Sequence, residues 1–314
     1  MGVGEIAGET VRRTGGTIGA GASGRRPELG RIGIWAGDLD GCPAAGVRTA
    51  AAAIEDLGYG TLWFAETAGR EAMAQAGILL SATRRITVAA GMTDIYARDA
   101  VTGAAAQRTL EEAFPGRFLL GLWASHPSLA EDVRGHRYGP PAATMRAYLD
   151  ALDAAPFGPP GAVAPSHRVL AALEPDMLAL AAERAWGANP LGMPVEHTRD
   201  ARALLGPDAL LAVTQLCVLS PDRARTAELA RATAASALPN RRTLLHALGY
   251  EDVESLGDRI VDAIVAHGSA EDIARRVQEQ FAAGADHVSL HVRTATPGAP
   301  PTREWERLAA QLLA

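Results

Sequence analysis

The chain has 314 residues, of which 48% are hydrophobic and 21% charged, so it can bury one large core or two small ones. Thirty basic and 36 acidic side chains give a net charge of −6, which does not favour a nucleic-acid or anionic-membrane partner. Every basic side chain is arginine. The absence of lysine excludes Schiff-base aldolases, a pyridoxal phosphate anchor and a P-loop lysine.

The first 28 residues differ from the rest, because they contain eight glycines and no sustained apolar periodicity. We therefore predict a disordered, glycine-rich tail over 1–28. The Arg12-Arg13 pair could begin a twin-arginine export signal, but the apolar segment after it is too thin. Cys42 and Cys217 are far apart and form no metal or redox motif. These features predict a cytoplasmic protein without disulfides.

From residue 29 onward, short apolar runs alternate with helical patterns. The expected strands are 31–35, 61–66, 86–91, 118–124, 168–173, 186–189, 210–219 and 287–292. The expected helices are 43–57, 71–83, 100–113, 142–154, one that starts at 174–176, 194–205, two or three within 221–283, and 302–313.

Strands this uniformly apolar are typical of a parallel sheet that is buried on both faces, and eight of them can close into a (β/α)8 TIM barrel. The main alternative is a doubly wound open sheet. Gly33, Gly37 and Gly41 do not have the G-x-G-x-x-G spacing that this alternative favours after its first strand. We predict one barrel domain over 29–314, with insertions after strands four and seven at 125–166 and 220–283.

In a TIM barrel, functional side chains gather where the strands end. The residues expected there are Trp35, Glu66, Gly91, Met92, Thr93, Ser125, His126, Asn189 and His291. This set has few charges, and a mouth lined by Trp35, Met92 and Trp123 with a few polar groups suits a flat heteroaromatic ligand.

Several segments of the chain together resemble the bacterial luciferase-like superfamily, and most closely its branch of coenzyme F420-dependent oxidoreductases. The similar segments span residues 30 to 292: LGYGTLWFAE (57–66), TRRITVAAG (83–91), ARDA (97–100), FPGRFLLGL (114–122) and AGADHV (283–288). Their order and spacing carry the resemblance.

The resemblance implies a cofactor, coenzyme F420, bound at the strand ends. Members often place an acid and a histidine after strand two; here Glu66 is followed by Thr67, so proton transfer would fall to Glu66 or His126. The cofactor-binding positions implied are Trp35, Thr67, Ala90, Gly91, Met92, Thr93, Ser125, Leu173 and Glu174. Members also tend to have a non-proline cis peptide in strand three, which would fall within 89–91.

The turn after strand five departs from the family pattern. Related chains have a glycine-bearing turn there, whose N–H groups hold the cofactor phosphate at a helix start. This chain has Leu173-Glu174-Pro175-Asp176, with two acids and a proline that supplies no N–H. The sequence therefore leaves open a loss of cofactor binding.

Each candidate also has a plain structural interpretation. Glu66 could favour the dipole of the next helix, His126 could lie in a surface loop, and Glu174 could simply begin a helix. Thr67 and Thr93 could be turn hydroxyls, and Trp35 could be core. His136, His246 and His267 have no acidic or cysteine neighbours at metal-binding spacing, so no metal site is predicted.

The sequence thus predicts an F420-dependent oxidoreductase that performs two-electron hydride chemistry on a small organic substrate. The alternatives are an FMN-dependent monooxygenase and a non-catalytic relative that has lost its cofactor. The resemblance also implies a homodimer.

Overall fold

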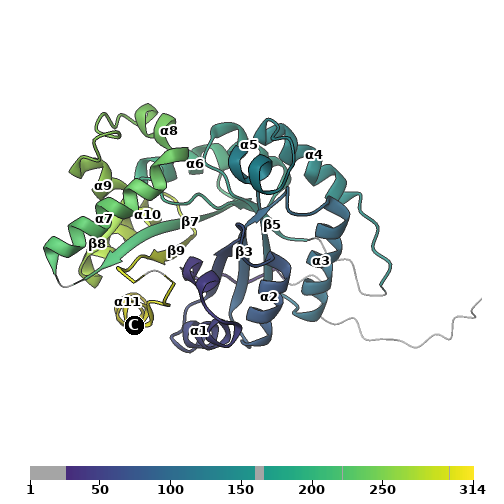
Figure 1. Cartoon of the computed structure of the whole chain (residues 1–314), viewed down its shortest axis with the longest axis horizontal. Helices are drawn as coiled ribbons and strands as arrows, with labels where there is room; N and C mark the ends of the chain where they lie inside the picture. Colours follow the sequence, from purple (N-terminus) through teal and green to yellow (C-terminus); the bar gives the residue numbers. More distant parts are fainter. Residues whose placement is uncertain (1–25, 160–165, 221, 297) are drawn as a thin grey trace, which may run out of the picture.

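A computed structural model describes residues 26–159, 166–220, 222–296 and 298–314, so most of the predicted tail lies outside the described residues. Nine parallel strands form its sheet (Figure 1). They are β1 (Ile32–Trp35), β2 (Thr61–Ala65), β3 (Thr87–Asp94), β4 (Phe118–Trp123), β5 (Arg168–Leu170), β6 (Gly187–Ala188), β7 (Leu210–Leu219), β8 (Val265–Gly268) and β9 (His287–Val292). Eight of them close in the order β1-β2-β3-β4-β5-β6-β7-β9 and back to β1, which confirms the predicted (β/α)8 barrel.

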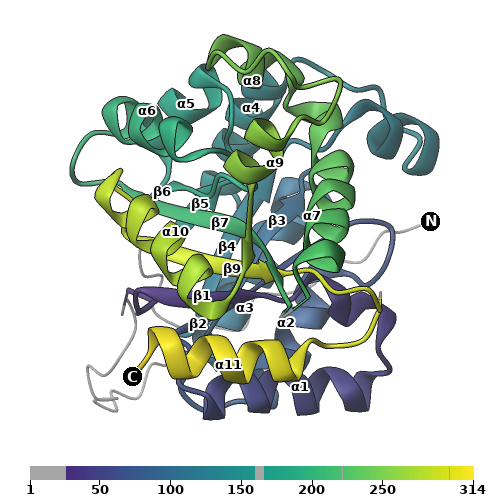
Figure 2. The same ribbon diagram turned by 90° about the vertical axis from the view of Figure 1, so that its left-hand side faces the viewer.

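Helices surround the strands, with α2 to α4 on one flank and α7 to α10 on the other (Figure 1). The α-helices are α1 (Ala44–Asp56), α2 (Ala72–Ser81), α3 (Ala100–Ala113), α4 (Pro141–Asp153), α5 (Pro175–Arg184), α6 (Val195–Leu205), α7 (Arg223–Ala237), α8 (Arg242–Ala247), α9 (Asp258–Ile264), α10 (Ala270–Ala282) and α11 (Thr302–Leu312). Short helical turns lie at η1 (Gly37–Gly41), η2 (Ser128–Val133) and η3 (Leu238–Asn240). The last helix, α11, lies beside α1 (Figure 2).

Helix starts follow the capping chemistry of the sequence. The Glu71 side chain accepts a hydrogen bond from Ala74 N at the start of α2, and the Asp99 side chain does the same for Thr102 N in α3. Ser269 and Asp272 form a reciprocal capping box on α10. Such caps stabilise each helix start by about 1 kcal/mol. They fix where each strand-to-helix loop ends, and these loops form the mouth of the barrel.

The insertion after β7 contains a strand that the sequence did not predict. The first residues of β7 pair with β6, whereas Leu216–Leu219 extend past β6 and pair with β8. The prediction of helices alone over 221–283 was therefore wrong at Val265–Gly268. This strand has four residues between two helices, which is too short to show a period of two.

Two indole rings lie in the barrel interior, within a cluster of buried apolar side chains. Trp63 is fully buried, and Trp35 stacks on it with ring centroids 6.5 Å apart and planes 13° apart. A β-bulge shifts the register of β3 between Ala90 and Thr93. Each peptide bond in the described residues is trans, so the expected cis bond within 89–91 is absent from the structure.

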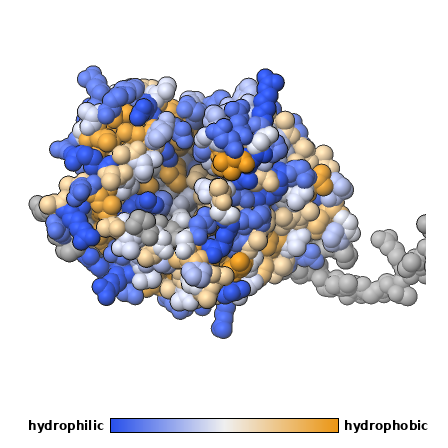
Figure 3. All heavy atoms as spheres, in the orientation of Figure 1, coloured by the Kyte–Doolittle hydropathy of each residue, from blue (hydrophilic) through white to orange (hydrophobic). Residues whose placement is uncertain are grey.

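No helix among the described residues is long and apolar enough to span a membrane. On the face drawn in Figure 3, hydrophilic side chains predominate and apolar ones are scattered among them. The large hydrophobic side chains that are exposed, Val101, Val133 and Leu204, lie on different elements. Scattered apolar groups of this kind are normal for a folded surface.

Candidate active site at the barrel mouth

A cavity of about 310 Å³ lies at the C-terminal ends of β1, β2, β3 and β9. The insertion after β7 closes one side of it, through the end of α7 and Arg241. The ends of parallel barrel strands are the usual position of a TIM-barrel active site. The volume lies at the lower end of the range for small-molecule sites.

Three of the sequence-predicted cofactor residues border this cavity: Trp35, Thr67 and Met92. The Trp35 ring lies between Trp63 and His291, whose ring centroid is 6.3 Å away. Trp35 is only 3% exposed, so it acts as the floor of the cavity as well as part of the core.

The small residues of β3 accommodate the two tryptophans. A Cβ atom at Gly91 would lie 2.8 Å from both Trp35 Cζ3 and Trp63 Cε3. The neighbouring Ala90 is fully buried, and its carbonyl accepts a hydrogen bond from Thr93 Oγ1 at 3.3 Å. Space that the sequence assigned to an approaching cofactor ring is therefore filled by side chains of the barrel itself.

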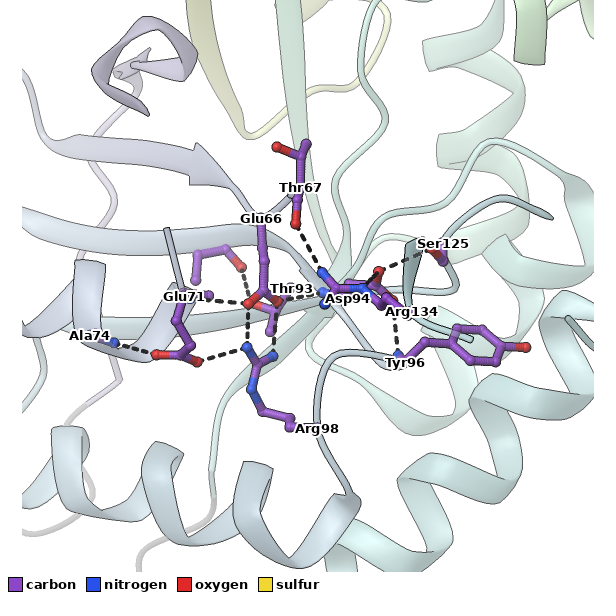
Figure 4. Close-up of polar contacts among 12 residues, drawn as sticks. Glu66, Thr67, Glu71, Ala74, Thr93, Asp94, Tyr96, Arg98, Ser125 and Arg134 are labelled. Carbon is purple, nitrogen blue, oxygen red and sulfur yellow. Dashed lines mark hydrogen bonds and ion pairs between the residues drawn. The ribbon is translucent and has the colours of Figure 1, made fainter. Parts of the chain in front are cut away.

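Glu66 lies beside the cavity in a fully bonded corner (Figure 4). Its carboxylate forms a bidentate ion pair with Arg98 and accepts hydrogen bonds from Ala72 N and Asp94 N, both at 3.1 Å. Arg98 also contacts Glu71 at 2.7 Å. The buried strand ends on a carboxylate because that carboxylate joins β2, α2, β3 and the loop before α3.

A second buried ion pair continues this corner. Arg134 Nε lies 2.8 Å from the fully buried Asp94 Oδ2, and its Nη2 donates to the Thr67 carbonyl at 2.9 Å. Ser125 Oγ donates to the same carboxylate at 3.0 Å (Figure 4). Ser125 adopts a left-handed backbone conformation with φ of 62°, which this hydrogen bond helps to hold. We call these residues, Glu66, Asp94, Arg98, Ser125 and Arg134, the ion-pair corner.

His126 does not border the cavity. Its Nδ1 accepts a hydrogen bond from Leu129 N at 3.2 Å and lies 3.0 Å from Ser128 Oγ. Its ring packs edge-on against Trp123, with centroids 5.4 Å apart. These contacts place the imidazole at the start of η2, where it stabilises the loop after β4.

Leu173 and Glu174 also lie outside the cavity. Glu174 is the N-cap of α5 without a side-chain capping bond, and Pro175 occupies the first turn. Asp176 accepts the Met177 N–H with its own side chain at 2.8 Å. Burial and the neighbouring Asp176 raise the pKa of Glu174 above its ordinary value. This helix start therefore presents carboxylates where an anion would need free N–H groups.

The cavity contains buried polar atoms that lack partners among the described residues. They are Oε1 of Gln75, on α2, and Nδ1 of His291, at the end of β9. Burial, followed by the nearby Arg293, lowers the pKa of His291 to about 3, so the ring is neutral at ordinary pH. Buried polar atoms are normally hydrogen-bonded, so orphans beside a cavity mark a place for a ligand.

Sequence reasoning missed most of these residues. His291 was noted as a strand end, but Gln75 and Arg241 come from helical segments that carry no motif. Within the described part of the chain, no three His, Cys, Asp or Glu side chains are grouped to hold a metal ion.

The family model for luciferase-like monooxygenases matches residues 29–287. The chain belongs to this family. The match covers the barrel from β1 to the start of β9, and with it most of the cavity wall. Membership of the luciferase-like family supports an enzyme of the oxidoreductase and monooxygenase class.

Three individual proteins illustrate the range within this luciferase-like fold. A Mycobacterium tuberculosis protein, provisionally named a coenzyme F420-dependent oxidoreductase, is 31% identical over 120 residues, which is 38% of this chain and 35% of that protein. The coenzyme F420-dependent tetrahydromethanopterin reductase of Methanopyrus kandleri superposes with a TM-score of 0.70 at 16% identity, covering 90% of this chain and 97% of that one. The oxygenating constituent of a Pseudomonas putida diketocamphane monooxygenase, in complex with FMN, gives 0.67 at 14% identity, covering 89% and 95%.

Proposed function

We propose that this protein is a coenzyme F420-dependent oxidoreductase that transfers a hydride between the deazaflavin and a small organic substrate. The cavity at the barrel mouth would hold the ring system. The observation that carries the proposal is the composition of the cavity wall, where apolar Trp35 and Met92 lie alongside the orphaned polar atoms of Gln75 and His291.

This wall suits a flat heteroaromatic ring. The faces of such a ring need apolar contacts, and its polar edge needs a few fixed donors and acceptors. Gln75 Oε1 offers an acceptor, and the neutral His291 ring offers a polar group at Nδ1. A bound ligand that satisfies both would remove the desolvation cost of two unpaired buried atoms, about 1–3 kcal/mol each.

The bound deazaflavin would supply the hydride chemistry, and the chain would supply orientation, exclusion of water and proton handling. Glu66 is poorly placed for proton transfer, because both its oxygens already accept hydrogen bonds in the ion-pair corner. Asp40 borders the cavity instead, and burial is the main cause that raises its pKa, followed by Arg70 acting in the opposite direction. We propose Asp40 as the proton-handling group in place of Glu66 and His126.

The relatives support the choice of cofactor unevenly. The Mycobacterium tuberculosis and Methanopyrus kandleri proteins favour F420 by name, and the Pseudomonas putida enzyme favours FMN. The carboxylates at the start of α5 favour a third outcome, a relative that binds neither, because they occupy the helix start at which the family resemblance implies a phosphate. A binding measurement separates the three.

The test is a fluorescence titration of purified protein with F420 and with FMN, with Gln75→Met and Glu174→Gly measured in parallel. Saturable binding of F420 that weakens about tenfold in Gln75→Met would support the proposal, since the substitution removes one polar contact. Preference for FMN would move the protein to the monooxygenases. Absence of binding by the wild type, with binding gained in Glu174→Gly, would mean that the α5 corner excludes the cofactor.

Two further expectations stay predictions, the cytoplasmic location and the homodimer. Light scattering coupled to size-exclusion chromatography measures the second directly.

A further inference from the structure

Arg241 lies in the wall of the cavity and is hydrogen-bonded to backbone carbonyls. Its Nε and Nη2 donate to the Leu191 carbonyl at 3.1 and 2.8 Å, and its Nη1 donates to the Ala237 carbonyl at 2.5 Å. A guanidinium has five N–H groups. Three of them are used in these contacts, so two have no acceptor among the described residues.

This arginine differs from the two arginines of the ion-pair corner. Arg98 and Arg134 each pair with a buried carboxylate. Arg241 has no carboxylate within ion-pair distance in the described parts of the chain, and burial lowers its pKa to about 10. The side chain therefore remains charged at neutral pH, and a partly buried positive charge is stabilised when an anion pairs with it.

Arg293, at the end of β9, adds a second positive charge to the same cavity, with its Nη1 3.5 Å from His291 Nε2. The acid that borders the cavity, Asp40, is solvent-exposed and forms no ion pair with Arg241. The cavity is thus cationic toward the insertion, whereas the α5 corner is anionic.

We propose that Arg241, assisted by Arg293, forms an oxyanion-binding subsite that receives a carboxylate or phosphate group of the molecule in the cavity. Planar, bidentate recognition of such groups is the property that distinguishes arginine from other cations. The proposal deepens the proposed function, because the oxyanion belongs either to the cofactor, replacing the phosphate position that α5 cannot supply, or to the substrate.

Two ligand pairs separate these sources. FMN against riboflavin, and F420 against its chromophore without the phosphate-bearing chain, isolate the cofactor phosphate. Benzoate against benzyl alcohol, titrated into protein loaded with the cofactor, isolates a substrate carboxylate. A cofactor source predicts about tenfold tighter binding of the phosphorylated partner, lost in Arg241→Gln. If the oxyanion belongs to the substrate, Arg241→Gln should weaken the binding of benzoate by a similar factor and leave the binding of benzyl alcohol unchanged.

A third arm does not depend on the proposed function. Inorganic phosphate, at constant ionic strength, should raise the melting temperature of the wild type but not that of Arg241→Gln. If no flavin or deazaflavin binds while this difference persists, the oxidoreductase proposal fails and the subsite stands. If Arg241→Gln does not fold, Arg241→Lys and Arg293→Gln replace it, since both should weaken phosphate binding.

Arg231→Gln is the matched control, because it removes one charge from an exposed position on the same insertion. It should change neither the two ligand preferences nor the response of the melting temperature to phosphate. The proposal is overturned if folded Arg241→Gln keeps both the phosphate response and the ligand preferences of the wild type, or if Arg231→Gln loses them equally. Arg241 would then be a clamp between the insertion and Leu191.

Discussion

The two sides of the barrel mouth treat buried charge in opposite ways. In the ion-pair corner, both Glu66 and Asp94 face an arginine, and each of their oxygens has a hydrogen-bond donor. On the cavity side, Arg241 pairs with carbonyls only, and polar atoms of Gln75 and His291 have no partner among the described residues. The corner is complete as it stands, whereas on our proposal a ligand completes the cavity side.

This contrast shows why position at a strand end does not by itself identify a functional residue. Glu66 directly follows β2, and His291 is the second-last residue of β9. Glu66 is held by four donors, so moving or protonating it would break the loop structure around it. His291 carries a shielded Nδ1 with no hydrogen-bond partner in the described part of the chain. Whether a buried polar group has hydrogen-bond partners distinguishes a structural role from a binding role better than its position in the fold does.

The largest effect that would test the corner is expected from Glu66→Gln. The amide would place N–H groups against existing donors and leave the Arg98 guanidinium buried without its main counter-charge. Breaking one partner of a buried pair costs about 3–5 kcal/mol of the free energy of unfolding, measured by chemical denaturation. Glu183→Gln, which removes an exposed pair with Arg146, is the control and should have a far smaller effect. Equal effects would mean that the corner is not a structural unit.

Low pH should destabilise the protein through His287, which lies in the barrel interior beneath both sides of the mouth. His287 accepts a hydrogen bond from Trp63 Nε1 at 3.0 Å and contacts the Gly30 carbonyl at 2.9 Å, and burial lowers its pKa to about 4. The unfolded chain has the ordinary value of about 6.5 and therefore binds a proton first as pH falls. The contribution of neutral His287 to the free energy of unfolding is therefore fully present above about pH 6.5. It falls by about 3 kcal/mol as the pH approaches 4.

The measurement is the free energy of unfolding against pH for the wild type and for His287→Gln. The variant should be less stable than the wild type at pH 7. Its free energy of unfolding should fall less between pH 6.5 and 5, because it has no imidazole to protonate. Parallel curves would refute the assignment of this pH dependence to His287.

Gly121→Ala should break the contact between β3 and β4 behind the ion-pair corner. A Cβ atom there would lie 2.5 Å from the Gly91 carbonyl oxygen, which is backbone and cannot turn away. Overpacking of this kind costs about 1–3 kcal/mol. Gly77→Ala is a matched substitution in α2, where the nearest atom to a new Cβ is Leu110 Cδ2 at 4.0 Å. It should stabilise the protein by up to about 1 kcal/mol, because alanine favours helix. Thermal melts compare the two.

The fold was predictable from the sequence because apolar runs mark the buried strands; the predicted range 210–219 coincides with β7. The site was predictable only in part. Trp35, Thr67 and Met92 lie at or near strand ends and border the cavity, as a barrel requires. The partners of Glu66 and Asp94 are 32 and 40 residues away in the chain, on loops whose paths no local pattern encodes. Gln75 enters from α2 and Arg241 from the turn between η3 and α8, and which side chains these segments turn to the cavity depends on how they pack on the barrel.

The smallest effect on stability, and the sharpest test of the cavity side, is expected from Gln75→Met. The side chain is 2% exposed and its Oε1 has no partner among the described residues, so the substitution of similar volume removes a buried polar group that forms no bond. The free energy of unfolding should stay within about 1 kcal/mol of the wild type or rise. Ligand affinity should nevertheless fall about tenfold, because methionine offers the ligand no amide acceptor in place of Gln75 Oε1. A marked loss of stability without loss of binding would mean that Gln75 belongs to the same class as Glu66, and the distinction between the two sides of the mouth would not hold.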